Sequence, residues 1–120
     1  MSPKKIIQKF YKSDAIVNPA TLVGFLHQDV VVEWHSSKGF VKLKFDDLVN
    51  LATEMSTAYA ASFVKISNII SEKKTVSVQY KHFISTIENP DEEILLANFM
   101  IVWKIKGDKL YRGYQMSHIF

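Results

Sequence analysis

Histidine, tyrosine and carboxylate side chains interrupt otherwise apolar stretches of this 120-residue chain. His35 follows a β-branched run, and because imidazole titrates near neutrality it could exchange a proton without a large pKa shift. Glu33 would share the face of His35 on a strand, where it could orient the ring or simply pair with it. Asp14 lies one turn after Tyr11 on the apolar side of a helical segment, where a carboxylate needs a partner. The pattern therefore allows acid–base chemistry.

Other chemistries have weaker support in the sequence. A metal site would need converging ligands, and although His35, His82 and His118 could converge with Glu33, the chain has no short-spaced ligand pair. The absence of cysteine excludes thiol chemistry. The serines lack a nucleophile-elbow motif, and the glycines form no phosphate-binding loop. We therefore expect neither a metal nor a cofactor.

Length and composition limit the class of protein. Residues 1–120 fit one domain, and the 48% of apolar residues excludes intrinsic disorder. No run of about 18 apolar residues could span a membrane, and the first ten residues lack the apolar core of a secretory signal. The absence of cysteine fits the cytoplasm. We expect a single cytoplasmic domain that has no membrane partner.

The net charge of +3 belongs to one short segment. Lys4, Lys5, Lys9 and Lys12 have no acidic residue among them, while the rest of the chain carries eleven basic and twelve acidic residues. Arg112 is the only arginine, and base readout favours arginine. No nucleic-acid-binding motif is present. We expect these lysines to form the solvated face of a helix, and we expect no nucleic-acid partner.

Apolar periodicity predicts helices first and strands afterwards. The predicted helices cover about residues 3–16, 21–27 and 46–59, with short extended segments at 30–35 and 40–45. From residue 62 the period becomes two, which predicts strands at about 62–72, 74–87, 93–106 and 109–119. Short connections between successive strands favour antiparallel pairing. The order α-α-β-(β)-α-β-β-β-β indicates an α+β fold in which helices pack on one sheet.

The turns predict which side chains share a face of the sheet. A two-residue turn at Gly107-Asp108 would place Phe99 beside Met116, and the looser hairpin before it would place His82 beside Phe99. The inner face would then be apolar with a few polar groups, which is the usual character of a ligand site. Each polar residue could equally be a core side chain with a satisfied hydrogen bond. The predicted pocket residues are Trp34, Tyr80, His82, Phe99, Ile101, Trp103, Tyr114, Met116 and His118.

Four segments carry a family pattern: Phe10-Tyr11, Asn18-Pro19, residues 28–34 and residues 103–110. In order and spacing they resemble the nuclear transport factor 2-like superfamily, in particular its small bacterial polyketide-cyclase and ketosteroid-isomerase-like members. The resemblance covers nearly the whole chain. It implies a curved antiparallel sheet wrapped on three N-terminal helices into a cone with one deep pocket. It also implies a homodimer formed through the outer face of the sheet.

The isomerase branch of that superfamily implies roles for three positions. Its helical tyrosine, an oxyanion donor, matches Tyr11, and its strand base matches His35. Its second oxyanion donor is a protonated aspartic acid, and this position falls on Ile101, which cannot donate a hydrogen bond. Loss of one such donor typically lowers the rate by about 10²–10³. Ketosteroid isomerisation itself is therefore not expected.

Two functions remain open from the sequence. The first is an enzyme-like protein that binds a small apolar or carbonyl compound and performs proton transfer, cyclisation or hydration. In this hypothesis His35 is the general acid or base, and Tyr11 and Asp14 assist it. The second is a non-catalytic binding or dimerisation module whose pocket holds an apolar ligand or is simply filled. The fold does not choose between them.

Overall fold

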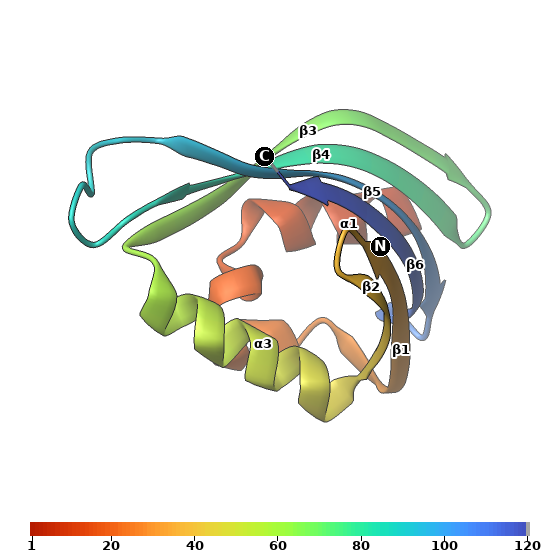
Figure 1. Ribbon diagram of the computed structural model, residues 1–120. Coiled ribbons are helices and arrows are strands. Elements are labelled where there is room, and N and C mark those ends of the chain that lie inside the picture. Colours follow the sequence, from red (N-terminus) through yellow and green to blue (C-terminus); the bar gives the residue numbers. More distant parts are fainter. Residues whose placement is uncertain (120) are drawn as a thin grey trace.

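The computed structural model describes residues 1–119 and shows a curved sheet that arches over the helices (Figure 1). The helical elements are α1 (Pro3–Lys12), the 3-10 helix η1 (Ala15–Val17), α2 (Pro19–Val23) and α3 (Phe45–Ala58). The strands are β1 (Leu26–Ser36), β2 (Gly39–Lys44), β3 (Ala61–Glu72), β4 (Thr75–Ser85), β5 (Ile94–Lys106) and β6 (Lys109–Ile119). This order confirms the predicted α+β fold. Within the described residues no helix is both long and apolar enough to cross a membrane.

The six strands form one open, mixed sheet in the order β2-β1-β6-β5-β4-β3. The pairs that are joined by hairpins are antiparallel, as predicted. β1 and β6 lie side by side and run parallel, which the long chain between them permits, because a parallel pair needs a crossover connection. The β1–β6 pair brings residues from both halves of the sequence to one inner face.

A serine at each end sets the length of α1. Ser2 accepts a hydrogen bond from the Lys5 amide at 3.3 Å and so caps the first turn. The helix ends at Lys12 rather than near residue 16, because the extended Ser13 donates its hydroxyl to the Phe10 carbonyl at 2.6 Å. The predicted first helix is therefore shortened, and its last residues form η1 instead.

The second helix lies earlier in the sequence than predicted. Asn18 accepts a hydrogen bond from the Ala20 amide at 3.1 Å, and α2 begins directly after this cap and ends at Val23. Directly before β1, the Phe25 carbonyl accepts a hydrogen bond from the Leu110 amide at 2.9 Å. This bond draws the segment alongside β6, so the strand starts before the predicted residue 30.

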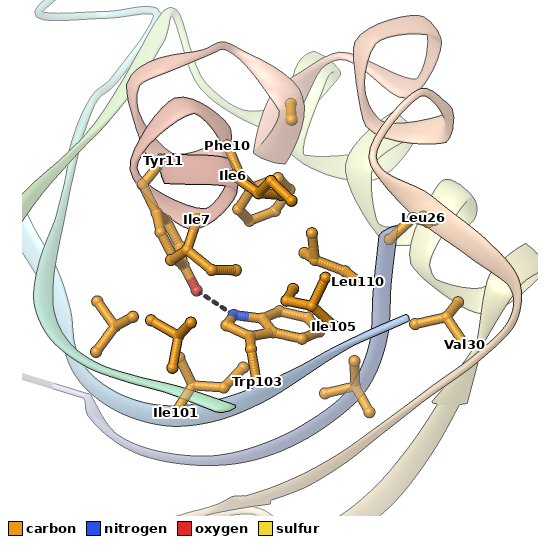
Figure 2. Packing of buried hydrophobic residues seen from close by; sticks show 14 of the residues in the cluster. Ile6, Ile7, Phe10, Tyr11, Leu26, Val30, Ile101, Trp103, Ile105 and Leu110 are labelled. Carbon is orange, nitrogen blue, oxygen red and sulfur yellow. Dashed lines mark hydrogen bonds between the residues drawn. The ribbon is translucent and has the colours of Figure 1, made fainter. Parts of the chain in front are cut away.

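The core forms where α1 packs against the inner face of the sheet (Figure 2). Burial of each large apolar side chain contributes roughly 1.5–3 kcal/mol relative to exposure. The Trp103 indole donates a hydrogen bond to the Tyr11 hydroxyl at 2.9 Å, and the two side chains point toward each other in Figure 2. The buried residues of α1 are Ile6, Ile7, Phe10 and Tyr11.

The predicted inner face of β4 is confirmed. Val76, Val78, Tyr80, His82 and Ile84 are buried, whereas the alternate residues Ser77, Gln79 and Lys81 are exposed. The cross-strand partners differ from the prediction by two positions, since Phe99 pairs with Tyr80 rather than with His82. A shift of two residues keeps every side chain on its face, whereas a shift of one exchanges the faces.

Strand β6 turns the opposite face inward from the one predicted. The two-residue turn forms as expected. Tyr111 then bulges out of the ladder, because its neighbours Leu110 and Arg112 pair with the consecutive residues Ile105 and Lys104. One extra residue exchanges the faces of all that follows. Three predicted pocket residues therefore lie on the outer face, which corrects the prediction: Tyr114, Met116 and His118.

Side-chain contacts account for the position of the bulge. The Tyr111 ring centroid lies 4.0 Å from the Arg112 guanidinium and 4.8 Å from the Lys106 ammonium. The His27 ring meets it edge-on at 4.9 Å. Arg112 also donates a hydrogen bond to the Asp29 carbonyl at 2.7 Å. Together these contacts hold the Tyr111 ring outside the core.

Gly113 lies close to the Trp103 indole. A Cβ atom at Gly113 would lie 2.9 Å from the indole ring, which is buried and held by its hydrogen bond. We expect Gly113→Ala to lower the free energy of unfolding by about 1–3 kcal/mol, measured by urea denaturation. Gly24→Ala is the control, because its Cβ would meet only the Thr21 carbonyl at 3.4 Å. Equal effects of the two substitutions would contradict the packing argument.

Candidate functional site

A cavity of about 170 Å³ lies between α3 and the inner face of the sheet. Because an apolar cavity of about 150 Å³ can hold benzene, this one has room for a single six-membered ring with small substituents. Among the described residues, its wall contains no lysine, arginine, aspartate or glutamate. The wall residues are Phe10, Tyr11, Ile16, Leu22, Leu26, Val32, Trp34, Leu43, Leu48, Leu51, Ala52, Met55, Tyr80, His82, Leu96, Phe99, Trp103 and Gln115.

Aromatic rings of β1, β4 and β5 form one side of this cavity. Tyr80 and Phe99 stack at 4.9 Å between centroids with an interplanar angle of 10°. The Trp34 ring lies 6.2 Å from Phe99, and its Nε1 donates a hydrogen bond to the Ser117 hydroxyl at 2.9 Å. Because the indole N–H is already satisfied, Trp34 contributes apolar surface to the cavity rather than a free donor.

The Tyr11 hydroxyl is a buried polar group in the wall. Its oxygen accepts the hydrogen bond from Trp103, and its ring centroid lies 4.6 Å from that of Tyr80. Burial raises the pKa of Tyr11, and hydrogen bonds with Trp103 and Tyr80 offset only part of that rise. Burial likewise raises the pKa of Tyr80. Both phenols therefore keep their protons at neutral pH, and their neighbouring hydroxyl groups are neutral hydrogen-bonding groups of the wall.

His82 is the second polar side chain of interest in the wall. It is 4% exposed, and its Nε2 lies 2.5 Å from the Ser62 hydroxyl oxygen. Burial lowers the pKa of His82 to about 4, because an imidazolium ion would lose its hydration there. The ring is therefore neutral at physiological pH.

Part of the predicted site does come together at this cavity. Ile101 also faces inward, but it is 1% exposed and packs in the core instead of lining the cavity. Its position is therefore closed to a ligand as well as unable to donate a hydrogen bond. The predicted residues that line the cavity are Tyr11, Trp34, Tyr80, His82, Phe99 and Trp103.

The predicted acid–base residue His35 lies on the other face of the sheet. Alternation along β1 turns Val32 and Trp34 toward the cavity and therefore turns Glu33 and His35 away from it. His35 is exposed, and its ring packs 4.5 Å from that of Phe40. The sheet separates His35 from the cavity, so the prediction that it is the pocket's general acid or base is wrong.

Other predicted residues are also absent from the cavity wall. Asp14 is exposed in the turn between α1 and η1 and accepts a hydrogen bond from Asn18 at 2.8 Å, which lowers the pKa of its carboxyl group. Tyr114, Met116 and His118 lie on the outer face beyond the Tyr111 bulge. Across residues 1–119, no three histidine or carboxylate side chains gather as a metal ion would require.

The wall that α3 provides was not among the predicted pocket residues. Leu48, Leu51, Ala52 and Met55 occupy positions i, i+3, i+4 and i+7 of α3, and all of them line the cavity. This spacing is the apolar stripe of an amphipathic helix, so the signal was present in the sequence. Gln115 was missed for another reason, since it faces inward only because of the bulge in β6.

No family model matches the chain, and no curated protein matches it in sequence. Solved structures match it over nearly its whole length. IdmH, a proposed polyketide cyclase from Streptomyces antibioticus, has a TM-score of 0.76 at 9% identity, with 98% of this chain and 92% of that chain covered. An LEH-like epoxide hydrolase from M. tuberculosis has a TM-score of 0.72 at 14% identity, covering 96% and 81%.

A third structure has a ketosteroid isomerase-like fold and comes from Catenulispora acidiphila, in complex with trimethylamine. Its TM-score is 0.73 at 11% identity, with 96% of this chain and 85% of that chain covered. At sequence identities this low, the similarity establishes the fold alone. The chain has the fold of the nuclear transport factor 2-like superfamily, which its sequence segments resemble.

Proposed function

We propose that this protein binds a small, neutral, mainly apolar molecule that carries a hydrogen-bond acceptor such as a carbonyl oxygen. The observation that carries the proposal is a cavity wall without charge that contains the protonated Tyr11 hydroxyl. An ionised ligand would lose its hydration there without gaining a counter-charge. A carbonyl oxygen would instead exchange its hydrogen bonds with water for one from Tyr11.

The structural neighbours support a function that involves small molecules. They include proposed polyketide cyclases and an epoxide hydrolase. The fold therefore accommodates enzymes that act on small organic compounds, but a fold does not assign a reaction. The choice between binding and catalysis rests on the side chains of the cavity.

These side chains favour binding over acid–base catalysis. With a pKa of about 4, His82 is a weak base at neutral pH. His35 and Asp14, the other predicted acid–base groups, lie outside the wall. Proton transfer, cyclisation or hydration in this cavity would have to rely on Tyr11 as an acid, and burial makes its phenol a poor one.

We further propose that two copies of the chain pair through the outer face of the sheet. Exposed apolar side chains gather there on neighbouring strands, and Met100 pairs directly with Met116 across β5 and β6. A patch of this kind on an uncovered face is typical of an interface. Its members are Ile70, Met100, Tyr114 and Met116.

The distribution of charge supports a second copy as the partner. One end of the long strands has a net positive charge, because its two tight turns carry four lysines and two acids: Lys73, Lys74, Lys106 and Lys109 with Glu72 and Asp108. The other end carries four acids in the β4–β5 connection: Glu88, Asp91, Glu92 and Glu93. A two-fold axis that set the strands of two copies antiparallel would bring the basic end of one against the acidic end of the other.

Tyr11→Phe tests the ligand proposal. We expect cyclohexanone to bind Tyr11→Phe about fivefold more weakly than wild-type protein, because one net hydrogen bond of about 1 kcal/mol is lost. Methylcyclohexane has no acceptor and should bind both proteins alike. Dissociation constants are measured by NMR titration.

Tyr114→Phe is the matched control for this test. It makes the same chemical change, loss of a phenol hydroxyl, on the outer face of the sheet and should leave both affinities unchanged. Two results would contradict the proposal. One is that neither compound binds the wild-type protein, and the other is that Tyr11→Phe weakens the ketone and the hydrocarbon equally.

His82 predicts a pH dependence of stability. The pKa of this histidine is about 4 in the folded protein, against its ordinary value of 6.5. Between these pH values the unfolded chain binds a proton that the folded protein does not. The free energy of unfolding therefore decreases as the pH is lowered from 6.5 to 4, by up to about 3 kcal/mol. We expect His82→Leu to flatten the pH profile of the unfolding free energy between pH 6.5 and 4. A profile as steep as that of the wild type would show that another group titrates.

The pairing proposal is tested by sedimentation equilibrium. Wild-type protein should sediment at twice the 13.8 kDa of one chain, and the double variant Met100→Lys, Met116→Lys should sediment as a monomer, because it places like charges at the interface. Val23→Lys, at an exposed apolar position on α2, should remain dimeric. A monomeric wild-type protein would overturn the proposal.

A further inference from the structure

The pair formed by Ser62 and His82 is a feature of the cavity wall that Tyr11 does not explain. Ser62 on β3 and His82 on β4 lie on the inner face, and the contact between the Ser62 hydroxyl oxygen and Nε2 is 2.5 Å. Among the described residues, the His82 ring makes its hydrogen bond through Nε2, and its Nδ1 atom has no hydrogen-bond partner. Since His82 lines the cavity, Nδ1 is left to interact with a bound molecule.

The roles of the two nitrogens follow from the partner. A neutral imidazole carries one hydrogen, on Nδ1 or on Nε2, and the hydrogen bond made by one nitrogen fixes the state of the other. The Ser62 hydroxyl pairs with His82. If the hydroxyl donates its hydrogen to Nε2, that hydrogen is satisfied. Nε2 is then an acceptor, and the ring hydrogen stands on Nδ1.

We propose that Ser62 is a positioning residue that holds His82 as an Nδ1–H donor, so that the cavity selects small ring compounds with two acceptor oxygens at opposite ends, such as cyclic diketones or quinones. This inference rests on the proposed ligand-binding function, in which Tyr11 meets the first oxygen. His82 meets the second and becomes a residue that determines specificity.

The side chains that carry the two donors stand at separate points of one wall. Tyr80, whose ring packs on that of Tyr11 at 4.6 Å, stands two residues before His82 on the same face of β4. Two residues along a strand span about 7 Å, so the Tyr80 ring, on which Tyr11 packs, and the His82 ring follow each other along one side of the cavity. The Phe99 ring stacks on Tyr80 and lies 6.2 Å from His82, so apolar surface bridges the two donors.

The first experiment needs no ligand. Nitrogen-15 NMR of the His82 ring distinguishes a hydrogen on Nδ1 from one on Nε2. We expect the Nδ1–H form in wild-type protein, a mixture of both forms in Ser62→Ala, and recovery of the Nδ1–H form in Ser62→Thr, which keeps the hydroxyl. An Nε2–H ring in wild-type protein, or no change in Ser62→Ala, would overturn the role of Ser62.

The second experiment compares 1,4-cyclohexanedione with cyclohexanone, which differ by one acceptor oxygen. The ratio of their dissociation constants should shift about fivefold against the dione in His82→Leu, the fold-change expected for one lost net hydrogen bond. Ser62→Ala should shift the ratio in the same direction and Ser62→Thr should restore it. His35→Leu, on the outer face, should leave the ratio unchanged.

The two experiments separate the two proposals. If cyclohexanone binds the wild type but the ratio is the same in His82→Leu, the two-oxygen selectivity is wrong and the ligand-binding function stands. If neither ketone binds the wild type, the ligand-binding function fails and the selectivity fails with it. The NMR result decides the role of Ser62 in both cases.

Discussion

The hydrogen bond from Trp103 to Tyr11 is the contact on which both the core and the cavity depend. It joins α1 to β5 across 92 residues of sequence and satisfies two polar atoms inside an otherwise apolar cluster. A buried donor or acceptor that loses its partner costs about 1–3 kcal/mol. Removal of either side chain would therefore leave an unsatisfied polar atom on the other and lower the stability of the protein. The same bond occupies the tyrosine oxygen as an acceptor, and the Tyr80 hydroxyl lies beside it in the wall. One contact therefore positions the helix on the sheet and sets the polarity of the site.

The bulge at Tyr111 makes that contact possible. Trp103 pairs with Gly113, and a Cβ atom at this glycine would lie 2.9 Å from the indole ring. In an unbroken ladder Trp103 would instead face Arg112, which would place a guanidinium inside the core. The bulge moves Arg112 to the outer face, where it packs on the Tyr111 ring. A single extra residue thus removes a charge from the core and supplies the space that the indole needs.

The sequence predicted what alternation and turn chemistry control. Polar and apolar residues alternate cleanly along β4, so its inner face could be assigned before the structure was known. The run Val30-Val31-Val32 has no alternation, so nothing in it tells whether Trp34 or His35 faces the cavity. The face of β6 was beyond prediction for another reason: its bulge is held by contacts with distant residues, His27 and Asp29 among them. The stripe along α3 was readable, but only the fold shows that it closes the cavity.

The cavity also shows how a site can be selective without carrying charge. Each of its two candidate donors is held by a neighbour, Tyr11 by Trp103 and His82 by Ser62. Because those partners lie in the core and on the adjacent strand, the donors are oriented before any ligand arrives, and little ordering remains to oppose binding. Burial keeps the phenol protonated and the imidazole neutral. The wall can therefore discriminate among neutral compounds by the number and position of their acceptor atoms, while the cost of desolvation excludes ions.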